Sequence, residues 1–207
     1  MEYQGRMHPA ISEFSRKYLY NNEALRDSSK LNRVWDYREY ADRAVWKNVC
    51  GKKNCERDND EEVRVITDEI SKFIGYATQN PKKQDAEDNG VWSIAVLTYY
   101  KKQEAKLKQA IALMVNNSNT NRSFYELKDK NVQIMIYSVD KFQGKEADVV
   151  FLSMVKSGEV GLGFMDSPNR LNVALTRAKF QRVIVGDRDY FLHSKNYLFE
   201  ELAGEEK

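Results

Sequence analysis

Residues 138–179 read SVDKFQGKEADVVFLSMVKSGEVGLGFMDSPNRLNVALTRAK, and this stretch decides the predicted fold. Its first half places a polar turn, residues 140–146, directly before an apolar run, residues 147–153. That run has the length and the β-branched content of a buried strand. Because α/β sheets bind ligands at turns that adjoin strand ends, the polar turn is a candidate binding segment.

The second half of the stretch predicts a helix that carries two arginines. Ser167 can cap the first free N–H groups, and Pro168 suits the first helical position, where no N–H is needed. Arg170, Ala174 and Arg177 are spaced i, i+4 and i+7, which places both guanidinium groups on one helix face. An apolar stripe beside them would dock the helix: Leu171, Leu175 and Ala178. A held guanidinium fork suits a phosphate, but an ordinary surface helix with two arginines has the same spacing, so both interpretations stay open.

The rest of the chain alternates strands with helices. Apolar runs predict strands at 91–98, 132–136 and 182–186, and helical spacing predicts helices at 61–76 and 103–115. Such alternation predicts an α/β fold of three layers, in which a mainly parallel sheet is flanked by helices on both faces.

Two polar stretches interrupt this alternation. Residues 27–62 predict a long polar loop or insertion, in which residues 34–37 could form a short strand, and residues 116–130 predict a surface loop. Asp68 and Glu69 imitate the carboxylate pair that holds magnesium in an ATPase. Because they stand in a helical pattern rather than at the end of a buried strand, we expect them to face solvent.

Composition sets limits on partners and on metals. The 207 residues carry 33 basic and 31 acidic side chains, a net charge of +2, so any contact with nucleic acid must come from a local groove. Cys50 and Cys55 are too few for a zinc site, and His8 and His193 lie far from them in sequence, so we predict no metal site and two reduced thiols. No apolar run approaches the roughly 20 residues that cross a bilayer, and no signal-peptide pattern opens the chain. We therefore expect an intracellular, cytoplasmic protein without membrane contact, or a nuclear one in a eukaryote.

Residues 138–153 and 168–179 resemble the last two motifs of superfamily 1 helicases of the nonsense-mediated-decay type. That family shows T-V-D-S-F-Q-G-x-E-x-D before a strand and R-x-N-V-A-L-T-R-A on a helix, and residues 170–178 match the second motif without a gap. Ser138 stands for the threonine and Lys141 for the serine of the first motif.

Two further segments resemble the same family. Residues 4–11 match its Q-Y-R-M-H-P-x-I motif except at Gly5, which replaces a tyrosine whose ring is expected to stack on the nucleotide base. Tyr3 is the nearest ring that could substitute. Residues 94–103 resemble the motif I-x-V-x-T-P-Y-x-x-Q, with Thr98 at its threonine and Tyr99 in place of the proline. The Thr98 hydroxyl is either a phosphate contact or a cap for the next helix.

The resemblance implies that residues 1–207 form a single RecA-like domain, the second motor domain of a larger helicase. The sequence contains no G-x-x-x-x-G-K-[ST] loop and no strand that ends in a carboxylate pair, and the family carries both in its first motor domain. ATP and Mg would therefore be bound mainly by that missing domain, and the chain alone would be inactive. Single-stranded RNA or DNA and the first motor domain are the implied partners.

The resemblance also assigns site residues. Arg6 and Arg177 would act as arginine fingers on the γ-phosphate. The implied nucleotide contacts are Gln143, Gly144, Glu146 and Arg170. The implied nucleic-acid contacts are Thr98, Ser138 and Lys141.

Three alternatives remain open from the sequence. A non-catalytic nucleic-acid-binding scaffold with a degenerate helicase fold is favoured by Gly5. A metal nuclease would use Asp140, Glu146 and Asp148, although their spacing is not that of metal ligands. Finally, Glu146 could merely form a surface ion pair with Lys145 or Arg182, and Gln143-Gly144 could be an ordinary turn.

Overall fold

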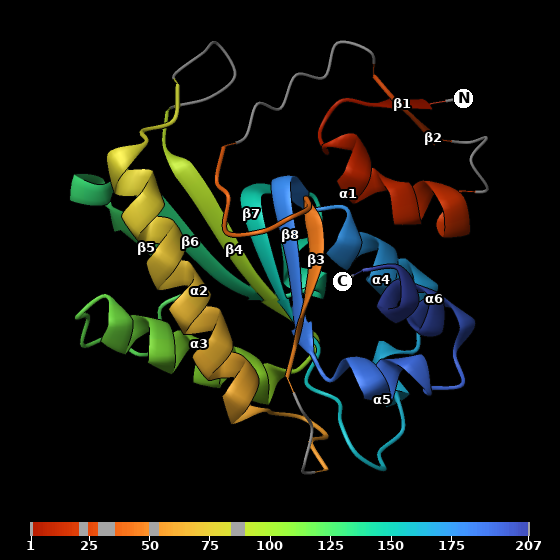
Figure 1. The fold of residues 1–207 in the computed structure, drawn as a ribbon. Helices are drawn as coiled ribbons and strands as arrows, with labels where there is room; N and C mark the ends of the chain where they lie inside the picture. Colours follow the sequence, from red (N-terminus) through yellow and green to blue (C-terminus); the bar gives the residue numbers. More distant parts are fainter. Residues whose placement is uncertain (1, 21–24, 29–35, 50–53, 84–89, 207) are drawn as a thin grey trace.

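A six-stranded sheet forms the centre of the molecule (Figure 1). A computed structural model describes residues 2–20, 25–28, 36–49, 54–83 and 90–206. The sheet order is β3-β8-β7-β4-β6-β5, and β5 alone among these strands pairs antiparallel with its neighbour. The strands are β3 (Ala44–Asn48), β4 (Trp92–Thr98), β5 (Phe124–Leu127), β6 (Val132–Ser138), β7 (Ala147–Ser153) and β8 (Ala178–Gly186). A separate parallel pair, β1 (Glu2–Gln4) and β2 (Leu25–Asp27), lies near the amino terminus.

Helices cover both faces of the sheet, so the fold has three layers. α2 (Asp60–Gln79) and α3 (Lys101–Met114) lie on one side, as Figure 1 shows, and their apolar residues pack against β4, β7 and β8. The other side carries four helices: α1 (Pro9–Phe14), α4 (Pro168–Leu175), α5 (Arg188–Leu192) and α6 (Tyr197–Glu205). The predicted α/β class, with a mainly parallel sheet flanked by helices, is confirmed.

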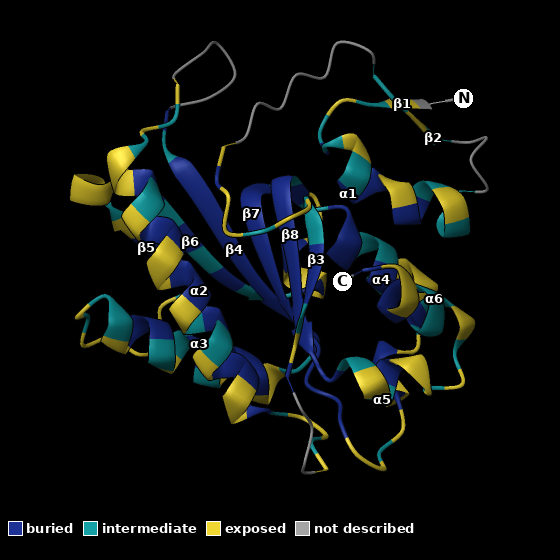
Figure 2. Cartoon of the chain, viewed as in Figure 1, coloured by how far each residue is buried: buried dark blue, intermediate teal, exposed yellow. Residues whose placement is uncertain are grey.

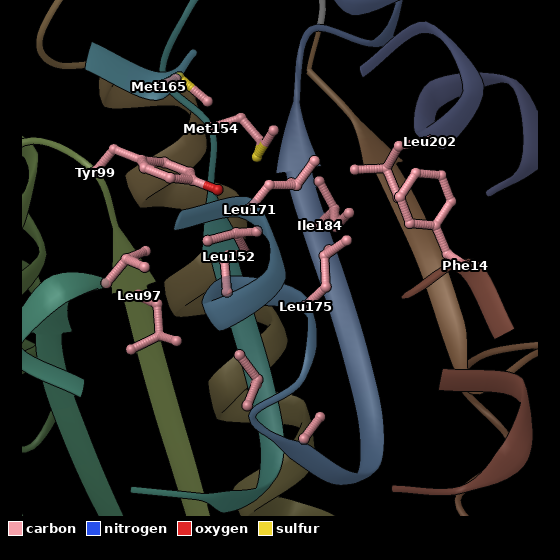
Figure 3. Packing of buried hydrophobic residues seen from close by; sticks show 14 of the residues in the cluster. Phe14, Leu97, Tyr99, Leu152, Met154, Met165, Leu171, Leu175, Ile184 and Leu202 are labelled. Atoms are coloured by element: carbon pink, nitrogen blue, oxygen red, sulfur yellow. The ribbon is translucent and has the colours of Figure 1, made fainter. Parts of the chain in front are cut away.

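Two cores hold these layers together, one on each face. Figure 2 shows the central strands as buried along their length, and all residues of β4 and β7 are buried. Such strands read as continuous apolar runs because both faces are covered. In the core under α4, Leu171 and Leu175 meet Leu152 and Ile184 of the sheet (Figure 3). Leu171 and Leu175 of the predicted apolar stripe therefore form the docking face of α4, whereas Ala178 is the first residue of β8.

The parallel arrangement gives the sheet two functional edges. We call the end where β4, β6, β7 and β8 finish the carboxyl edge; Thr98 pairs there with Ser138 and with Ser153. We call the end where β7 and β8 begin the amino edge; Ala147 pairs there with Ala178. Residues 139–146 run from the carboxyl edge, where β6 ends, to the amino edge, where β7 begins.

Two of the predicted loops contain strands. β3 lies within residues 27–62 and pairs in parallel with β8, and β5 lies within residues 116–130 and pairs with β6. Both flank the sheet, so each buries few side chains: Val45 and Trp46 in β3, and Tyr125 in β5. Short strands with few buried positions give no clear apolar period, which is why the sequence did not predict them. In the possible strand at 34–37, residues 34 and 35 lie outside the described residues and residues 36 and 37 are not in a strand.

Three further expectations need correction or completion. Glu69 is buried rather than solvent-facing, and its carboxylate accepts a hydrogen bond from Tyr40 and pairs with Lys72 at 2.9 Å. Asp68 is exposed as predicted. α4 ends at Leu175, so Arg177 follows the helix rather than sharing its face with Arg170. Of the two cysteines, Cys55 is a free thiol and Cys50 lies outside the described residues.

Candidate nucleotide and nucleic-acid site

Three segments that are distant in sequence meet at the amino edge. The Ala147 amide donates to the Arg177 carbonyl at 3.0 Å, and the His8 amide donates to the Lys179 carbonyl at 3.0 Å. These backbone bonds fasten the loop before α1 and the start of β7 to the start of β8. The side chains of Arg6, Glu146 and Arg177 are thereby brought together, as the resemblance implied.

Glu146 is the central carboxylate of this group. Arg6 Nε donates to one of its oxygens, and Lys179 Nζ lies 2.7 Å from the other. Burial acts to raise the pKa of Glu146, but the hydrogen bonds from Lys179 and Arg6 outweigh it, so the pKa lies below its usual value. Glu146 is therefore ionised at neutral pH and holds two cations in place. Its partners differ from the surface pairing with Lys145 or Arg182 that the sequence left open.

Arg177 is held without a carboxylate. Its Nε donates to the Val173 carbonyl at 2.9 Å, Nη2 to Thr176 Oγ1 at 2.9 Å and Nη1 to the Lys145 carbonyl at 3.4 Å. Within the described part of the chain it forms no ion pair. Burial and the neighbouring charge of Arg6 lower its pKa, which shows that the two guanidinium groups lie close enough to repel each other. Such a pair of cations is stabilised by an added anion.

The backbone conformation of the turn before Glu146 explains why the predicted motif has a glycine at position 144. Gln143 and Gly144 are exposed, and Phe142 beneath them is fully buried and anchors the turn. Gly144 has φ +81°, a conformation that other residues adopt at a cost, and this lets the chain turn toward the amino edge.

The residues predicted to contact nucleic acid lie together at the carboxyl edge. Thr98 and Ser138 are paired strand ends, and the Val139 amide donates to the Thr98 carbonyl at 2.9 Å. Ser138 is half-buried, and Lys141 is exposed, with its Nζ 3.3 Å from a Glu104 oxygen. Thr98 is fully buried.

The Thr98 hydroxyl accepts from the Tyr100 amide at 3.4 Å, just before α3 begins. The N-cap of α3 is Tyr100, and no side chain caps this helix, so the Thr98 hydroxyl does not act as a cap. The assignment of Thr98 as a phosphate contact stays a prediction.

Arg170 lies in the first turn of α4, at the opposite end of that helix from Arg177. Its Nε is 3.2 Å from Asp140 Oδ1, and its guanidinium carbon lies 3.8 Å from the centre of the Phe164 ring. The structure thus places Arg170 beside the carboxyl edge, apart from Arg6 and Arg177. The assignment of Arg170 as a nucleotide contact stays a prediction.

The three carboxylates of the nuclease alternative do not converge. Asp140 pairs with Arg170, and Glu146 pairs with Arg6 and Lys179. Asp148 is buried, with one oxygen 2.7 Å from Lys82 Nζ and the other accepting from the Ser93 amide and hydroxyl. Among the described residues no group of three metal-ligating side chains exists. This geometry gives no support to a metal nuclease.

Near the amino terminus, Gly5 is exposed and has open space around the position of a Cβ atom. Tyr3, in β1, exposes 67% of its surface. A role for the Tyr3 ring in stacking on a nucleotide base stays a prediction.

Sequence reasoning missed Lys179 and Phe164. Lys179 lies at the start of β8, before the strand that was predicted at residues 182–186, so no periodic signal pointed to it. Phe164 stands in a loop with no period, and its contact with Arg170 joins residues that only the fold brings together.

Comparisons with known proteins agree with this architecture. The family described as "AAA domain" matches residues 1–189. "Regulator of nonsense transcripts 1 homolog" of Drosophila melanogaster is 31% identical over 198 residues, which is 90% of this chain and 15% of that protein. "Helicase sen1" of Schizosaccharomyces pombe is 32% identical over 195 residues, 90% of this chain and 10% of that protein. Among solved structures, the large terminase of bacteriophage HK97 overlaps 87% of this chain and 33% of its own, with a TM-score of 0.39 and 13% identity, and this overlap carries no argument.

Fold and sequence similarity together define a helicase-family motor domain. The chain belongs to the AAA domain family, in the form found in superfamily 1 helicases of the nonsense-mediated-decay and Sen1 type. It spans 15% and 10% of the length of the two relatives named above. No helix in the described ranges is both long enough and apolar enough to cross a membrane.

Proposed function

We propose that this chain is the second motor domain of an ATP-dependent helicase or translocase, in which ATP is bound mainly by a first motor domain. The observation that carries the proposal is the cluster at the amino edge, where Arg6 and Lys179 both pair with Glu146 and Arg177 has no ion-pair partner among the described residues. A phosphate chain that entered from another domain would supply a negative charge for Arg177.

In this proposal Arg177 and Arg6 are the arginine fingers. Each guanidinium stays charged at physiological pH and donates a planar set of hydrogen bonds, which suits the oxygens of the γ-phosphate. Arg177 Nε is already bonded to a helix carbonyl, so the group is oriented before the nucleotide arrives. Glu146 holds Arg6 and Lys179, and the exposed Gln143 and Gly144 lie where a nucleotide would touch the turn.

ATP fits this cluster through its phosphates, whereas Mg finds no dedicated ligands here. The described residues contain no group of metal-ligating side chains, and the one carboxylate of the cluster is engaged by two cations. We therefore propose that Mg is bound together with ATP by the first motor domain.

The carboxyl edge would grip single-stranded RNA or DNA in the same proposal. Ser138 and the exposed Lys141 present a hydroxyl and a cation beside the strand ends, and such groups hold phosphates without reading base sequence. Residues 139–146 connect this edge directly to Glu146. A nucleotide-driven shift of Glu146 would thus reach the strand-binding turn through one short segment.

The proposal is tested by ATP hydrolysis in the intact protein, with and without single-stranded RNA or DNA. Wild type should be stimulated by the strand, and Arg177→Ala should lose about 10³-fold or more in rate while it still binds the strand. Arg64→Ala is the matched control, because Arg64 is exposed on α2 and pairs only with neighbours in that helix. If Arg177→Ala hydrolyses ATP at the wild-type rate, Arg177 is not the arginine finger.

A second candidate function is a nucleic-acid-binding scaffold without turnover. It is favoured by Gly5, which offers no ring for a nucleotide base. Strand binding without any ATP hydrolysis by the intact wild-type protein would establish this function in place of the motor.

A further inference from the structure

Phe164 is an exposed aromatic residue between two buried anchors. It lies in a short 3₁₀ turn, Gly163–Met165, and exposes 48% of its surface. Leu162 and Met165 on either side are buried in the core under α4, and Figure 3 shows Met165 there beside Met154 and Tyr99. The turn is therefore fixed from below while its aromatic ring stays at the surface.

The ring is held in one orientation by Arg170. The guanidinium lies over one face of the ring at 3.8 Å, and Arg170 Nη1 donates to the Phe164 carbonyl at 3.5 Å. Asp140 also holds the guanidinium, with its Oδ1 3.2 Å from Arg170 Nε. Six large apolar side chains are exposed in the described residues, and among them Phe164 is the one whose ring has an arginine guanidinium stacked on it. The others are Tyr3, Leu113, Phe124, Leu192 and Tyr197.

The position of this ring connects it to the carboxyl edge. Asp140 follows Ser138 by two residues, and Tyr100, which follows Thr98 by two residues, donates from its hydroxyl to the Leu162 carbonyl at 3.3 Å. Both strand ends that carry predicted nucleic-acid residues are thus tied to the turn that holds Phe164. Lys141 adds an exposed cation to the same edge.

We propose that Phe164 is a stacking site for one unpaired base of a single strand, with Arg170 and Asp140 as its positioning residues. This inference rests on the proposed function. Within the proposed nucleic-acid site at the carboxyl edge, the Phe164 ring would bind a base, whereas the other proposed residues would bind phosphates. A base would stack on the ring face opposite the guanidinium, while Lys141 contacts the backbone phosphates. Because every base has an aromatic face, such a site accepts any sequence, as a translocase requires. A ring that is already ordered loses little conformational freedom on binding.

The experiment compares two single strands of equal length, one with bases and one built of abasic nucleotides, for affinity to the intact protein. Phe164→Ala should weaken binding of the base-containing strand by about 5- to 150-fold and leave the abasic strand unchanged. Phe164→Trp should keep wild-type affinity, since indole also stacks. Phe124→Ala is the matched control, because Phe124 is an exposed phenylalanine on β5 and carries no arginine.

Three outcomes would overturn the inference. Equal affinity of Phe164→Ala and wild type for the base-containing strand removes the stacking role alone and leaves the motor proposal intact. Equal losses on both strands would mean that Phe164 supports the fold or contacts another protein surface. Failure of wild type to bind either strand would overturn both this inference and the proposed grip on nucleic acid.

Discussion

Two glutamates, one at each edge of the sheet, have opposite environments. Glu146, at the amino edge, is half-exposed and lies between Arg6 and Lys179, and its pKa is below the usual value although burial opposes this. Glu62, in the first turn of α2 at the carboxyl edge, is fully buried, and burial raises its pKa to about 8 although Ser153 and Val155 donate hydrogen bonds to it. Glu146 thus holds two charged side chains near the surface, whereas Glu62 is a buried, largely neutral carboxyl group that accepts hydrogen bonds at the carboxyl edge.

The buried support at the carboxyl edge is extensive. The Ser153 hydroxyl donates to Glu62 at 2.6 Å and accepts from Gln103 at 2.9 Å, and Gln103 also bonds the backbone of Asn59. The Val155 amide donates to Glu62 at 2.8 Å, and Val155 has φ +72°, an unfavourable conformation for a β-branched residue. Contacts from α2 and α3 therefore hold the end of β7, and α2 also holds the strained Val155 two residues beyond it. The amino edge, by contrast, keeps its charges at the surface, where a ligand can reach them.

The largest expected effect concerns the two arginines of the cluster at the amino edge, Arg6 and Arg177. Under the proposed function Arg6 is a charged donor to the developing phosphate charge, so Arg6→Ala should lower ATP hydrolysis by the intact protein by about 10²- to 10³-fold. Because Arg6 and Arg177 repel each other and would act on one phosphate, the double variant should lose less than the product of the two single losses.

Steady-state rates of the wild type, both single variants and the double variant check this expectation. Arg16→Ala is a control, since Arg16 pairs with Asp27 at 3.3 Å and belongs to a different cluster. Multiplicative losses in the double variant would contradict a shared target and would separate the two arginines into independent sites.

A smaller effect is expected from the pH dependence of folding at the carboxyl edge. The unfolded chain releases the Glu62 proton near its ordinary pKa, whereas the folded chain retains it until about pH 8. In this window the folded state binds more protons, so its free energy of unfolding falls as pH rises, by at most about 1.4 kcal/mol per pH unit. Glu62→Gln, which mimics the neutral acid, should abolish this contribution.

Denaturant unfolding between pH 5 and pH 8 measures the difference in slope between wild type and Glu62→Gln. Glu61→Gln is the matched control, because Glu61 is the adjacent residue of α2 and its side chain is 63% exposed. The same slope in wild type and Glu62→Gln would mean that Glu62 is already ionised in the fold, and the contrast between the two glutamates would disappear.

The sequence predicted the central strands and helices because their signals are strong and local. β4 and β7 are apolar along their length, and Ser167 accepts from the Arg170 amide at 3.5 Å in the predicted cap of α4. β3 and β5 were missed because flanking strands bury few residues.

The site was predicted less completely than the fold. The resemblance assigned Arg6, Glu146 and Arg177 to one nucleotide site, and the structure brings these side chains together, while their roles stay predictions. The spacing placed Arg170 and Arg177 on one helix face, because spacing cannot show that α4 ends at Leu175. The contacts of Glu62 and Phe164 depend on packing between distant segments, which carries no local signal.

The smallest expected effect concerns the segment that connects the two edges. Gly144 has φ +81° with open space around it, so a methyl group would meet no neighbour and only the backbone conformation would be strained. Gly144→Ala should lower the free energy of unfolding by about 1 kcal/mol, the usual cost of this conformation for alanine. Gly161→Ala is the matched control, since Gly161 also has open space but no positive φ.

Denaturant unfolding of both glycine variants under the same conditions separates the two causes. An equal loss in both would assign the effect to the unfolded chain or to general loop properties rather than to the turn. No loss in Gly144→Ala would mean that the turn relaxes without strain. In that case residues 139–146 would be a compliant connection, and a shift of Glu146 at the amino edge would not be transmitted to Ser138 and Lys141 at the carboxyl edge.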